Sequence, residues 1–191
     1  MTITKRRMRI HPLALSALPA ALLIGCGGGS SDAGLPQLAA ANPCTLKSCS
    51  DLAARINFPN TTITAASPVA AGTLTVAGTP VAAHCQITGK MHQRVSSVDG
   101  KSYAIGFEMR LPNTWNGRFF YQGNGGIDGN IVAATGAVNG GAGLNTALNM
   151  GFAVISSDAG HEAAMGPNFG IDPQARLDYG YQAVAKLTPM A

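Results

Sequence analysis

The sequence predicts an α/β protein, and three observations support that prediction. Residues 103–111 alternate large apolar side chains with small or polar ones, a period of two that is typical of a β-strand. Two short apolar runs, 119–121 and 152–155, have the character of strands buried on both faces, as in a parallel sheet. The segment from Asp172 onward has helical spacing. Strand, loop, helix and strand in this order begin an α/β architecture.

A β-rich segment is expected before these elements. Residues 57–83 contain turn signals between stretches of Thr, Val and Ala, which predict short strands near 61–65 and 73–76. Residues 85–95 would pair with 103–111 across a turn at Asp99-Gly100. Strand 103–111 would bury one face and end at Pro112. Residues 44–56 have the spacing of a helix, with one shared face formed by Leu46, Cys49, Leu52 or Ala53, and Ile56.

The later elements continue the α/β pattern. A loop rich in glycine follows run 119–121, and a helix at 144–150 is expected to lead into run 152–155. In the last helix Asp172 would cap the N-terminus and Pro173 would take the first helical position. No strand follows, so we expect the sheet to remain incomplete within these residues. The predicted buried face of this helix is Leu177, Tyr181, Val184 and Thr188.

Composition gives one domain with a real core. The chain has 191 residues, of which 46% are hydrophobic and 12% are charged, too apolar for a disordered chain. The formal charge of +4 includes four basic residues among the first nine. Nine Lys and Arg and nine Asp and Glu follow Gly25, so the remainder has no net charge. The basic balance therefore gives no reason to expect a nucleic-acid partner.

The N-terminus predicts export. A basic start precedes an apolar run at 13–24, which is too short to span a bilayer and resembles the core of a signal peptide. The run ends in Leu-Ile-Gly-Cys26, which resembles the bacterial lipobox whose cysteine is lipidated; an ordinary signal peptide with a stray cysteine is the alternative. We expect a signal peptide at 1–25, a flexible tether at 26–43 and one domain at 44–191. The protein would be periplasmic or at the cell surface, held to the outer membrane by its lipid, or secreted.

Three cysteines remain if Cys26 is lipidated, so one of Cys44, Cys49 and Cys85 should be left over. Export permits disulfides, and we expect a buried disulfide next to His84 at the surface. The spacing of Cys44 and Cys49 does not form a Cys-x-x-Cys pair, which makes a zinc site unexpected.

The glycine loop at 123–129 is the first candidate for chemistry. It fails the dinucleotide fingerprint because Asp128 stands where the third glycine belongs, and it lacks the Gly-Lys-Ser/Thr of a phosphate loop. An oxyanion hole is a third use of such a loop, because glycines let a substrate approach the backbone N–H groups. A purely structural turn is the alternative.

A second polar segment, 156–161, contains serine, aspartate and histidine. Triad members usually come from separate loops, and neither serine lies in a Gly-x-Ser-x-Gly elbow. We therefore interpret Asp158 and His161 as parts of a loop at a strand end, whose polar side chains hold backbone groups. We assign no role to His92, and interpret Trp115 as a packing anchor.

These blocks occur together in an order that resembles the N-terminal part of the tannase/feruloyl esterase family. The resemblance covers residues 49–191, about the first third of a family member. The motifs that carry it are His-Cys at 84–85, Phe-Glu-Met-Arg-Leu-Pro at 107–112, Trp-Asn-Gly-Arg-Phe at 115–119, Gln-Gly-Asn-Gly-Gly at 122–126, Ser-Asp-Ala-Gly-His at 157–161, and the long block at 169–181.

The resemblance implies an α/β-hydrolase fold that is incomplete here, lacking the large lid and the nucleophile elbow. It implies serine-dependent hydrolysis of aromatic carboxylic esters such as gallates, ferulates or a terephthalate half-ester. The family's Cys-Ser-x-Gly-Gly elbow is absent from this sequence, so no triad residue is carried over, and neither is the calcium site of the lid. We expect an N-terminal fragment that is inactive alone; the alternative is a non-catalytic lipoprotein module that binds a ligand or partner.

Three features do carry over from the family. Gly126 matches the glycine whose backbone N–H contributes to the oxyanion hole, and Gly123 and Gly125 shape the same loop. Cys49 matches the cysteine that pairs with Cys85, although a bridge from Cys44 to Cys85 stays open. We expect no cofactor in these residues.

Overall fold

The computed structural model describes residues 40–137 and 146–191. The expected signal peptide, Cys26 and most of the expected tether lie outside the described residues. In the described parts of the chain, no helix combines the length and apolarity needed to cross a bilayer.

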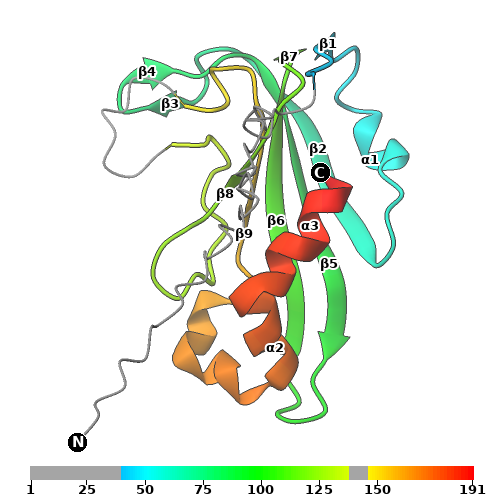
Figure 1. Ribbon diagram of the computed structural model, residues 1–191, viewed down its shortest axis with the longest axis vertical. Coiled ribbons are helices and arrows are strands. Elements are labelled where there is room, and N and C mark those ends of the chain that lie inside the picture. The colour runs from blue at the N-terminus through cyan, green and yellow to red at the C-terminus, as the bar shows by residue number, and fades with distance from the viewer. Residues whose placement is uncertain (1–39, 138–145) are drawn as a thin grey trace, which may run out of the picture. The chain divides into compact units, whose positions relative to one another are not determined.

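A five-stranded mixed sheet forms the centre of the domain (Figure 1). The strand order is β2-β5-β6-β9-β8, in which β8 and β9 are parallel and every other neighbouring pair is antiparallel. The expected parallel pair of short apolar runs is therefore confirmed. The strands of the sheet are β2 (Thr61–Val69), β5 (His84–Val95), β6 (Ser102–Pro112), β8 (Phe119–Gln122) and β9 (Ala153–Ser157).

The β5–β6 hairpin forms as the sequence predicts. Its turn is closed by the Ser96 N–H, which donates to the Lys101 carbonyl at 2.8 Å, and β6 ends at Pro112. The expectation of one buried face is wrong, because Glu108 and Arg110 on the second face are buried as well. The loop that contains Ala134 covers that face. Its Ala134 N–H donates to the Glu108 carboxylate at 2.9 Å.

The buried charge on this second face is paired. Arg110 Nε lies 2.7 Å from Glu108 Oε1, and its Nη1 lies 2.6 Å from His84 Nε2. A guanidinium can only donate, so His84 Nε2 accepts and its Nδ1–H donates to the Ala82 carbonyl at 2.7 Å. Burial lowers the pKa of His84, which agrees with a neutral ring. The expectation of a surface histidine is therefore wrong.

The segment before β2 is mostly not helical. The helix predicted over 44–56 is limited to α1 (Leu52–Arg55), and β1 (Cys44–Thr45) pairs with β7 (Thr114–Trp115) instead. The predicted face is nevertheless the one that meets the core, because Leu46, Cys49, Leu52 and Ile56 pack against it. A disulfide between Cys49 and Cys85 joins this segment covalently to β5.

Two further short strands, β3 (Thr75–Val76) and β4 (Thr79–Pro80), form a small hairpin beside the sheet. The helix expected at 144–150 begins outside the described residues, and residues 147–151 form turns.

The chain then ends in a helical segment that lies across one face of the sheet (Figure 1). Asp172 caps it as predicted, because its Oδ1 accepts from the Ala175 N–H at 2.6 Å, and Pro173 occupies the first position. The segment comprises η1 (Ala163–Ile171), α2 (Pro173–Leu177), the π-helical turn η2 (Asp178–Gln182) and α3 (Ala183–Met190).

The buried face of this segment differs from the predicted one. Leu177, Tyr181 and Val184 are 42%, 59% and 46% exposed, whereas Ala183 and Leu187 enter the core. The difference begins before η2, because Ala175 rather than Leu177 is buried in α2, and the extra residue of the π turn then brings Ala183 and Leu187 to the core side.

Candidate functional site

Two loops meet at the carboxyl ends of the parallel strands β8 and β9. In open α/β sheets this edge is where ligands bind. The glycine loop, residues 123–129, leaves β8 after Gln122, and the polar loop, residues 158–162, leaves β9 after Ser157. We take the glycine loop and its neighbours as the candidate site.

Gly126 lies at the tip of the glycine loop in a conformation that favours glycine. Its φ is +69°, and the Asp128 N–H donates to the Gly125 carbonyl at 3.3 Å to close a tight turn around it. A Cβ placed on Gly123, Gly125 or Gly126 would meet nothing within 4 Å. The Gly126 N–H donates to no acceptor among the described residues. Within the described residues, the loop thus presents an exposed backbone donor without an acceptor.

Asn124 fastens the glycine loop to the end of β9. Its side-chain amide donates to the Ser157 carbonyl at 2.8 Å and to Ser156 Oγ at 3.1 Å. The side-chain oxygen of Asn124, Oδ1, accepts from Gln122 Nε2 at 3.3 Å. This one side chain therefore ties together the ends of both parallel strands.

The far end of the glycine loop is held by backbone contacts. The Gly129 N–H donates to the Asp158 carbonyl at 3.1 Å, and the Gly129 carbonyl accepts from the Ala163 N–H at 2.8 Å. A Cβ on Gly129, where φ is +88°, would lie 2.7 Å from the Ala163 Cα. Glycine is required here by a close approach, whereas at Gly126 it leaves room for something outside the loop.

Asp158 holds backbone groups, as the sequence predicts. Its Oδ1 accepts from the N–H groups of Gly106 and Gly160 at 2.9 and 2.8 Å. Burial is the largest influence on its carboxyl and raises its pKa to about 6. The hydroxyls of Ser157 and Tyr121 lie 2.8 Å apart and form a hydrogen bond with each other instead of with a histidine.

His161 is buried, and the backbone of Ile127 and Ala159 lies near its ring without a well-formed hydrogen bond. Its side chain is 1% exposed, and neither ring nitrogen finds a partner among the described residues. The ring stacks on Phe169 with 3.7 Å between centroids, and Tyr179 contacts both rings edge-on. Burial lowers the pKa of His161, which favours the neutral ring. The sequence places His161 in this loop but gives no sign of the aromatic cluster, because its members come from three separate segments.

Asp128 is the other buried group without full hydrogen bonding. Its Oδ1 has no partner among the described residues, and burial raises the pKa of this carboxyl, opposed by the nearby His161. Its φ of +55° places it in the left-handed region directly after the tip of the glycine loop.

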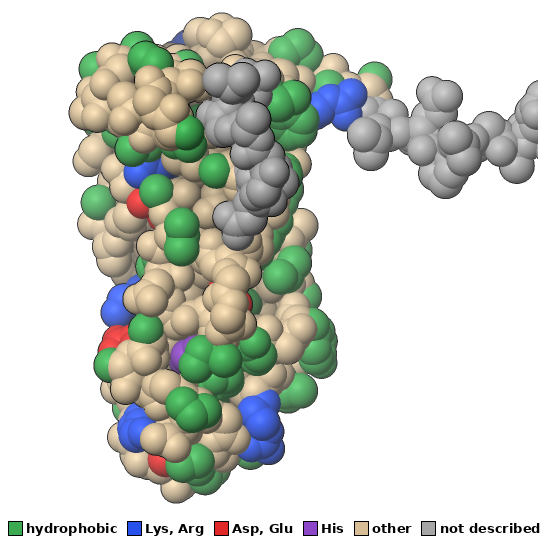
Figure 2. All heavy atoms as spheres, turned by 90° about the vertical axis from the view of Figure 1, so that its left-hand side faces the viewer, with side chains coloured by type: hydrophobic (Ala, Val, Ile, Leu, Met, Phe, Trp, Pro, Cys, Tyr) green, Lys and Arg blue, Asp and Glu red, His purple; other side chains and the backbone are tan. Residues whose placement is uncertain are grey.

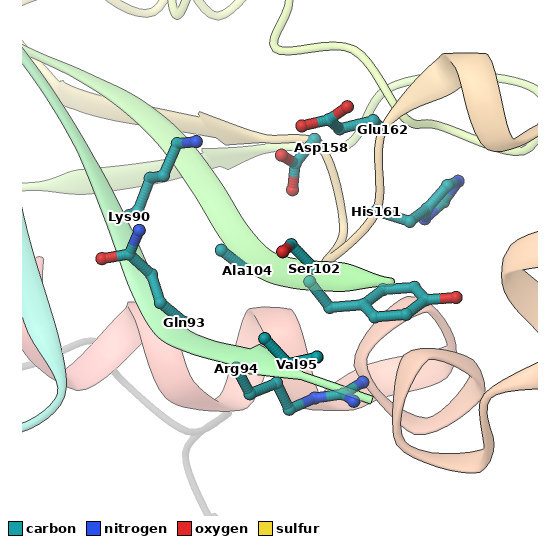
Figure 3. A pocket seen from close by; sticks show the side chains of 10 residues that line it. Lys90, Gln93, Arg94, Val95, Ser102, Ala104, Asp158, His161 and Glu162 are labelled. Carbon is teal, nitrogen blue, oxygen red and sulfur yellow. The ribbon is translucent and has the colours of Figure 1, made fainter. Parts of the chain in front are cut away.

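Two cavities border these loops. The smaller, of about 100 Å³, lies beside the glycine loop and is lined by Tyr121, Gly123, Asp128, Tyr179 and Val184 among others. The larger, of about 350 Å³, lies against β5 and β6, and Figure 3 shows Asp158 directed into it while the His161 ring turns away from Lys90 and Gln93. We place the candidate site at the glycine loop beside the smaller cavity, because Gly123, Asn124 and Asp128 of that loop line it.

The disulfide joins Cys49 to Cys85, with 5.4 Å between their Cα atoms, and Cys44 is free and exposed. The alternative bridge from Cys44 is therefore not formed. Trp115 lies in β7, and its indole N–H donates to the Arg118 carbonyl at 2.7 Å. In residues 40–137 and 146–191, no group of three or more His, Cys, Asp or Glu could hold a metal ion, so we derive no step through calcium.

Comparison with known proteins identifies the family and agrees with the fold. The family described as "Tannase and feruloyl esterase" matches residues 85–191. Mono(2-hydroxyethyl) terephthalate hydrolase from Piscinibacter sakaiensis is 42% identical over 113 residues, which are 55% of this chain and 18% of that protein. A probable feruloyl esterase B from Emericella nidulans is 30% identical over 139 residues, 71% of this chain and 25% of that protein.

Solved structures give the same result. The crystal structure of feruloyl esterase B from Aspergillus oryzae has a TM-score of 0.54 and 28% identity, covering 71% of this chain and 26% of that one. A mixed sheet with helices packed against it is thus shared with esterases, which places this protein in the α/β class. The chain belongs to the tannase and feruloyl esterase family. It spans between about a fifth and about a quarter of the length of these relatives.

Proposed function

We propose that this chain supplies the oxyanion-binding part of a serine-dependent hydrolase for aromatic carboxylic esters. The observation that carries the proposal is the N–H of Gly126, which meets no acceptor among the described residues and belongs to an exposed loop residue at the carboxyl edge of a parallel strand pair. Backbone donors aimed at the place where charge develops are among the largest contributors to acyl-transfer catalysis.

The chemistry divides into two steps. A serine hydroxyl attacks the ester carbonyl while a histidine takes its proton, and the former carbonyl oxygen becomes an oxyanion that accepts from the Gly126 N–H. Collapse of this intermediate expels the alcohol and leaves an acyl-enzyme, which water hydrolyses by the same route. Losing one such donor costs about 3–4 kcal/mol of transition-state stabilisation.

The nucleophile is proposed to lie outside these residues. The 191 residues contain neither a Gly-x-Ser-x-Gly nor a Cys-Ser-x-Gly-Gly elbow. Ser156 and Ser157 are committed to Asn124 and Tyr121, and neither forms a hydrogen bond with His161. We therefore propose that the chain alone has no esterase activity.

Exposed apolar side chains beside the loop support an aromatic substrate. Ile127 next to Gly126 is 45% exposed, and Val184 borders the same cavity as Gly123. An aromatic acyl group that placed its carbonyl at Gly126 could cover these side chains and remove apolar surface from water. Feruloyl and terephthalate esters, named for the relatives, have acyl groups of this kind.

We also propose export as a lipoprotein, with Cys26 as the acylated residue. The support is the sequence alone, in which a basic start and an apolar run end in a lipobox-like tetrapeptide.

Turnover of methyl ferulate and methyl gallate tests the function. The whole protein that the gene encodes should hydrolyse at least one of them, and the 191-residue chain should hydrolyse neither. Turnover by the 191-residue chain, lost on substitution of a serine within it, would contradict the assignment. A whole protein that binds but does not cleave these esters would favour a binding module instead.

A further inference from the structure

We propose that Tyr179 is a positioning residue for the Gly126 peptide, a role that rests on the function proposed above. The Tyr179 hydroxyl donates to the Gly126 carbonyl at 3.3 Å. The contact joins residues 53 positions apart and connects the helical segment to the glycine loop. Tyr179 lines the smaller cavity, and its hydroxyl contacts the Gly126–Ile127 peptide, the one that follows the peptide carrying the Gly126 N–H.

The glycine loop needs an external restraint. Glycines at 123, 125 and 126 have no side chains to pack, and each has more conformational freedom than any other residue. An oxyanion donor works only if its direction is set before charge develops. The loop therefore requires contacts that fix its peptide planes.

Two hydrogen bonds fix the two planes around Gly126. In a trans peptide the carbonyl and the N–H point to opposite sides. The Asp128 N–H holds the Gly125 carbonyl and so directs the Gly126 N–H. Tyr179 holds the Gly126 carbonyl and so directs the Ile127 N–H. With both planes held, Gly126 cannot rotate without breaking one of these contacts.

Tyr179 is itself held by buried aromatic rings. It meets His161 and Phe169 edge-on, with centroids 5.8 and 5.2 Å away. Those two rings are nearly inaccessible to solvent and stack on each other. This packing gives His161, which has no hydrogen bond among the described residues, a role as a flat support rather than a proton carrier.

The backbone around Tyr179 gives an independent reason to expect a function. Tyr179 lies in the π-helical turn η2, and π turns are rare and frequent at functional sites. The preceding Asp178 is fixed by Lys186 Nζ at 2.6 Å and by Gln174 Nε2 at 3.0 Å. The turn is thus held on one flank by these contacts and on the other by the aromatic cluster.

Nuclear magnetic resonance on the full chain tests the proposal with Tyr179→Phe, which removes only the hydroxyl. Tyr181→Phe is the matched control, because Tyr181 is exposed and its hydroxyl only accepts from Gln182. In Tyr179→Phe the amide of Asp128 should exchange about threefold to fivefold faster, because the turn opens more often. The carbonyl carbon of Gly126 should shift, while amides of β5 and β6 keep their wild-type rates.

Two results would overturn the positioning role. One is a Tyr179→Phe spectrum and exchange rate at residues 125–128 that match Tyr181→Phe. The other is faster exchange spread equally over β5, β6 and the loop, which would show a general structural effect of the hydroxyl.

Kinetics of the whole protein separate this proposal from the function on which it rests. If wild type cleaves methyl ferulate, Tyr179→Phe should lower kcat about threefold to tenfold and leave KM within twofold, because the loop contact acts on the donor's direction. If wild type shows no turnover but Tyr179→Phe still speeds exchange in the loop, the proposed hydrolase function is contradicted and the contact between Tyr179 and Gly126 is supported. Turnover with unchanged kcat in Tyr179→Phe would overturn the positioning role.

Discussion

At the scale of single residues, glycines in one loop serve opposite purposes. Gly129 is glycine because the backbone of Ala163 approaches it, and Gly126 is glycine because the loop must turn while leaving its N–H uncovered. Both have positive φ, so the backbone conformation alone does not distinguish them. The space around each one does.

Replacing Gly129 by alanine should therefore damage the fold. We expect a loss of about 2–4 kcal/mol in the free energy of unfolding, because a new Cβ meets backbone atoms and the φ is unfavourable. Gly72→Ala is the control: its φ is +78° and its Cβ meets nothing, so we expect only about 1 kcal/mol. Urea unfolding measures both free energies, and an equal loss in the two variants would contradict the close approach of Ala163 to Gly129.

Asp158 should make stability depend on pH. Its folded pKa of about 6 lies above the ordinary 3.8, so between these values the folded state binds more protons than the unfolded one. The contribution of Asp158 to the free energy of unfolding should be full below about pH 4 and should fall as the pH rises to about 6. The total fall is at most about 3 kcal/mol, and the contribution stays constant at higher pH.

Asp158→Asn checks this, because an amide keeps an oxygen acceptor for Gly106 and Gly160 but does not titrate. The difference in unfolding free energy between variant and wild type should grow from pH 4 to pH 6. A difference that is flat across that window would contradict the burial of the carboxyl.

Sequence reasoning at this scale found the loop but not its supports. The run of glycines after an apolar strand identifies Gly123, Gly125 and Gly126 as a possible donor loop. Tyr179 belongs to a recognisable block, but nothing in its spacing shows that it reaches Gly126. Such contacts depend on how distant segments fold together, which local periodicity does not encode.

At the scale of elements, patterns with a period of two were reliable and patterns of helical spacing were not. Strands β5, β6, β8 and β9 form where alternation and short apolar runs predict them. The final helix begins at its predicted cap, yet its buried side chains are Ala175, Ala183 and Leu187 instead of Leu177 and Val184, and the π turn lies between the two halves of that face. An added residue in one turn has no signature in the apolar spacing on either side.

Asp172 is the residue on which this helical segment depends most. It caps α2 and accepts two hydrogen bonds from Arg94, at 2.9 and 2.5 Å, while its side chain is 4% exposed. The Arg94 guanidinium holds the pKa of this carboxyl well below its usual range. Its contribution to stability is therefore present above about pH 4 and is lost as the pH falls through the lower, folded value.

Two substitutions separate the cap from the ion pair. Asp172→Asn keeps a capping oxygen but leaves Arg94 without its charge partner, and we expect a loss of about 2–3 kcal/mol in unfolding free energy. Asp172→Ala should lose about 1 kcal/mol more, because the Ala175 N–H also loses its acceptor. Denaturant unfolding at pH 7 measures both, and a milder loss in Asp172→Ala than in Asp172→Asn would contradict this division.

At the scale of the whole molecule, a disulfide closes the domain. The bond from Cys49 to Cys85 spans 36 residues and fixes the leading segment on β5. Loop-closure entropy for that separation predicts that Cys49→Ala with Cys85→Ala lowers the unfolding free energy by about 3–4 kcal/mol. Cys44→Ser should cost almost nothing, since Cys44 is exposed and free. A large loss in Cys44→Ser would indicate that the pairing is different in solution.

The described residues also include exposed apolar side chains. Figure 2 shows hydrophobic side chains at the surface of the face that carries the glycine loop. The exposed fraction of Ile127, Tyr181 and Val184 is high for side chains of this kind. Ile127 follows Gly126 in the loop and Val184 lines the smaller cavity, which is why we propose these two side chains as substrate contacts. The sequence predicts their apolar character, but it placed Tyr181 and Val184 in the core.

The proposed lipid anchor also belongs to the whole molecule. Cells fed radioactive palmitate should label the wild-type protein and not Cys26→Ser, and only wild type should sediment with the outer membrane. Export of an unlabelled wild-type protein into the medium would show an ordinary signal peptide.

The central claim is that the Gly126 N–H stabilises an oxyanion, and kcat for methyl ferulate in the whole protein tests it most directly. Gly126→Ala should lower kcat by a factor of about 10²–10³ with little change in KM, because a side chain at positive φ moves the donor. Gly72→Ala, equally strained but remote, should retain the wild-type kcat. A Gly126→Ala enzyme with the wild-type kcat would contradict the account.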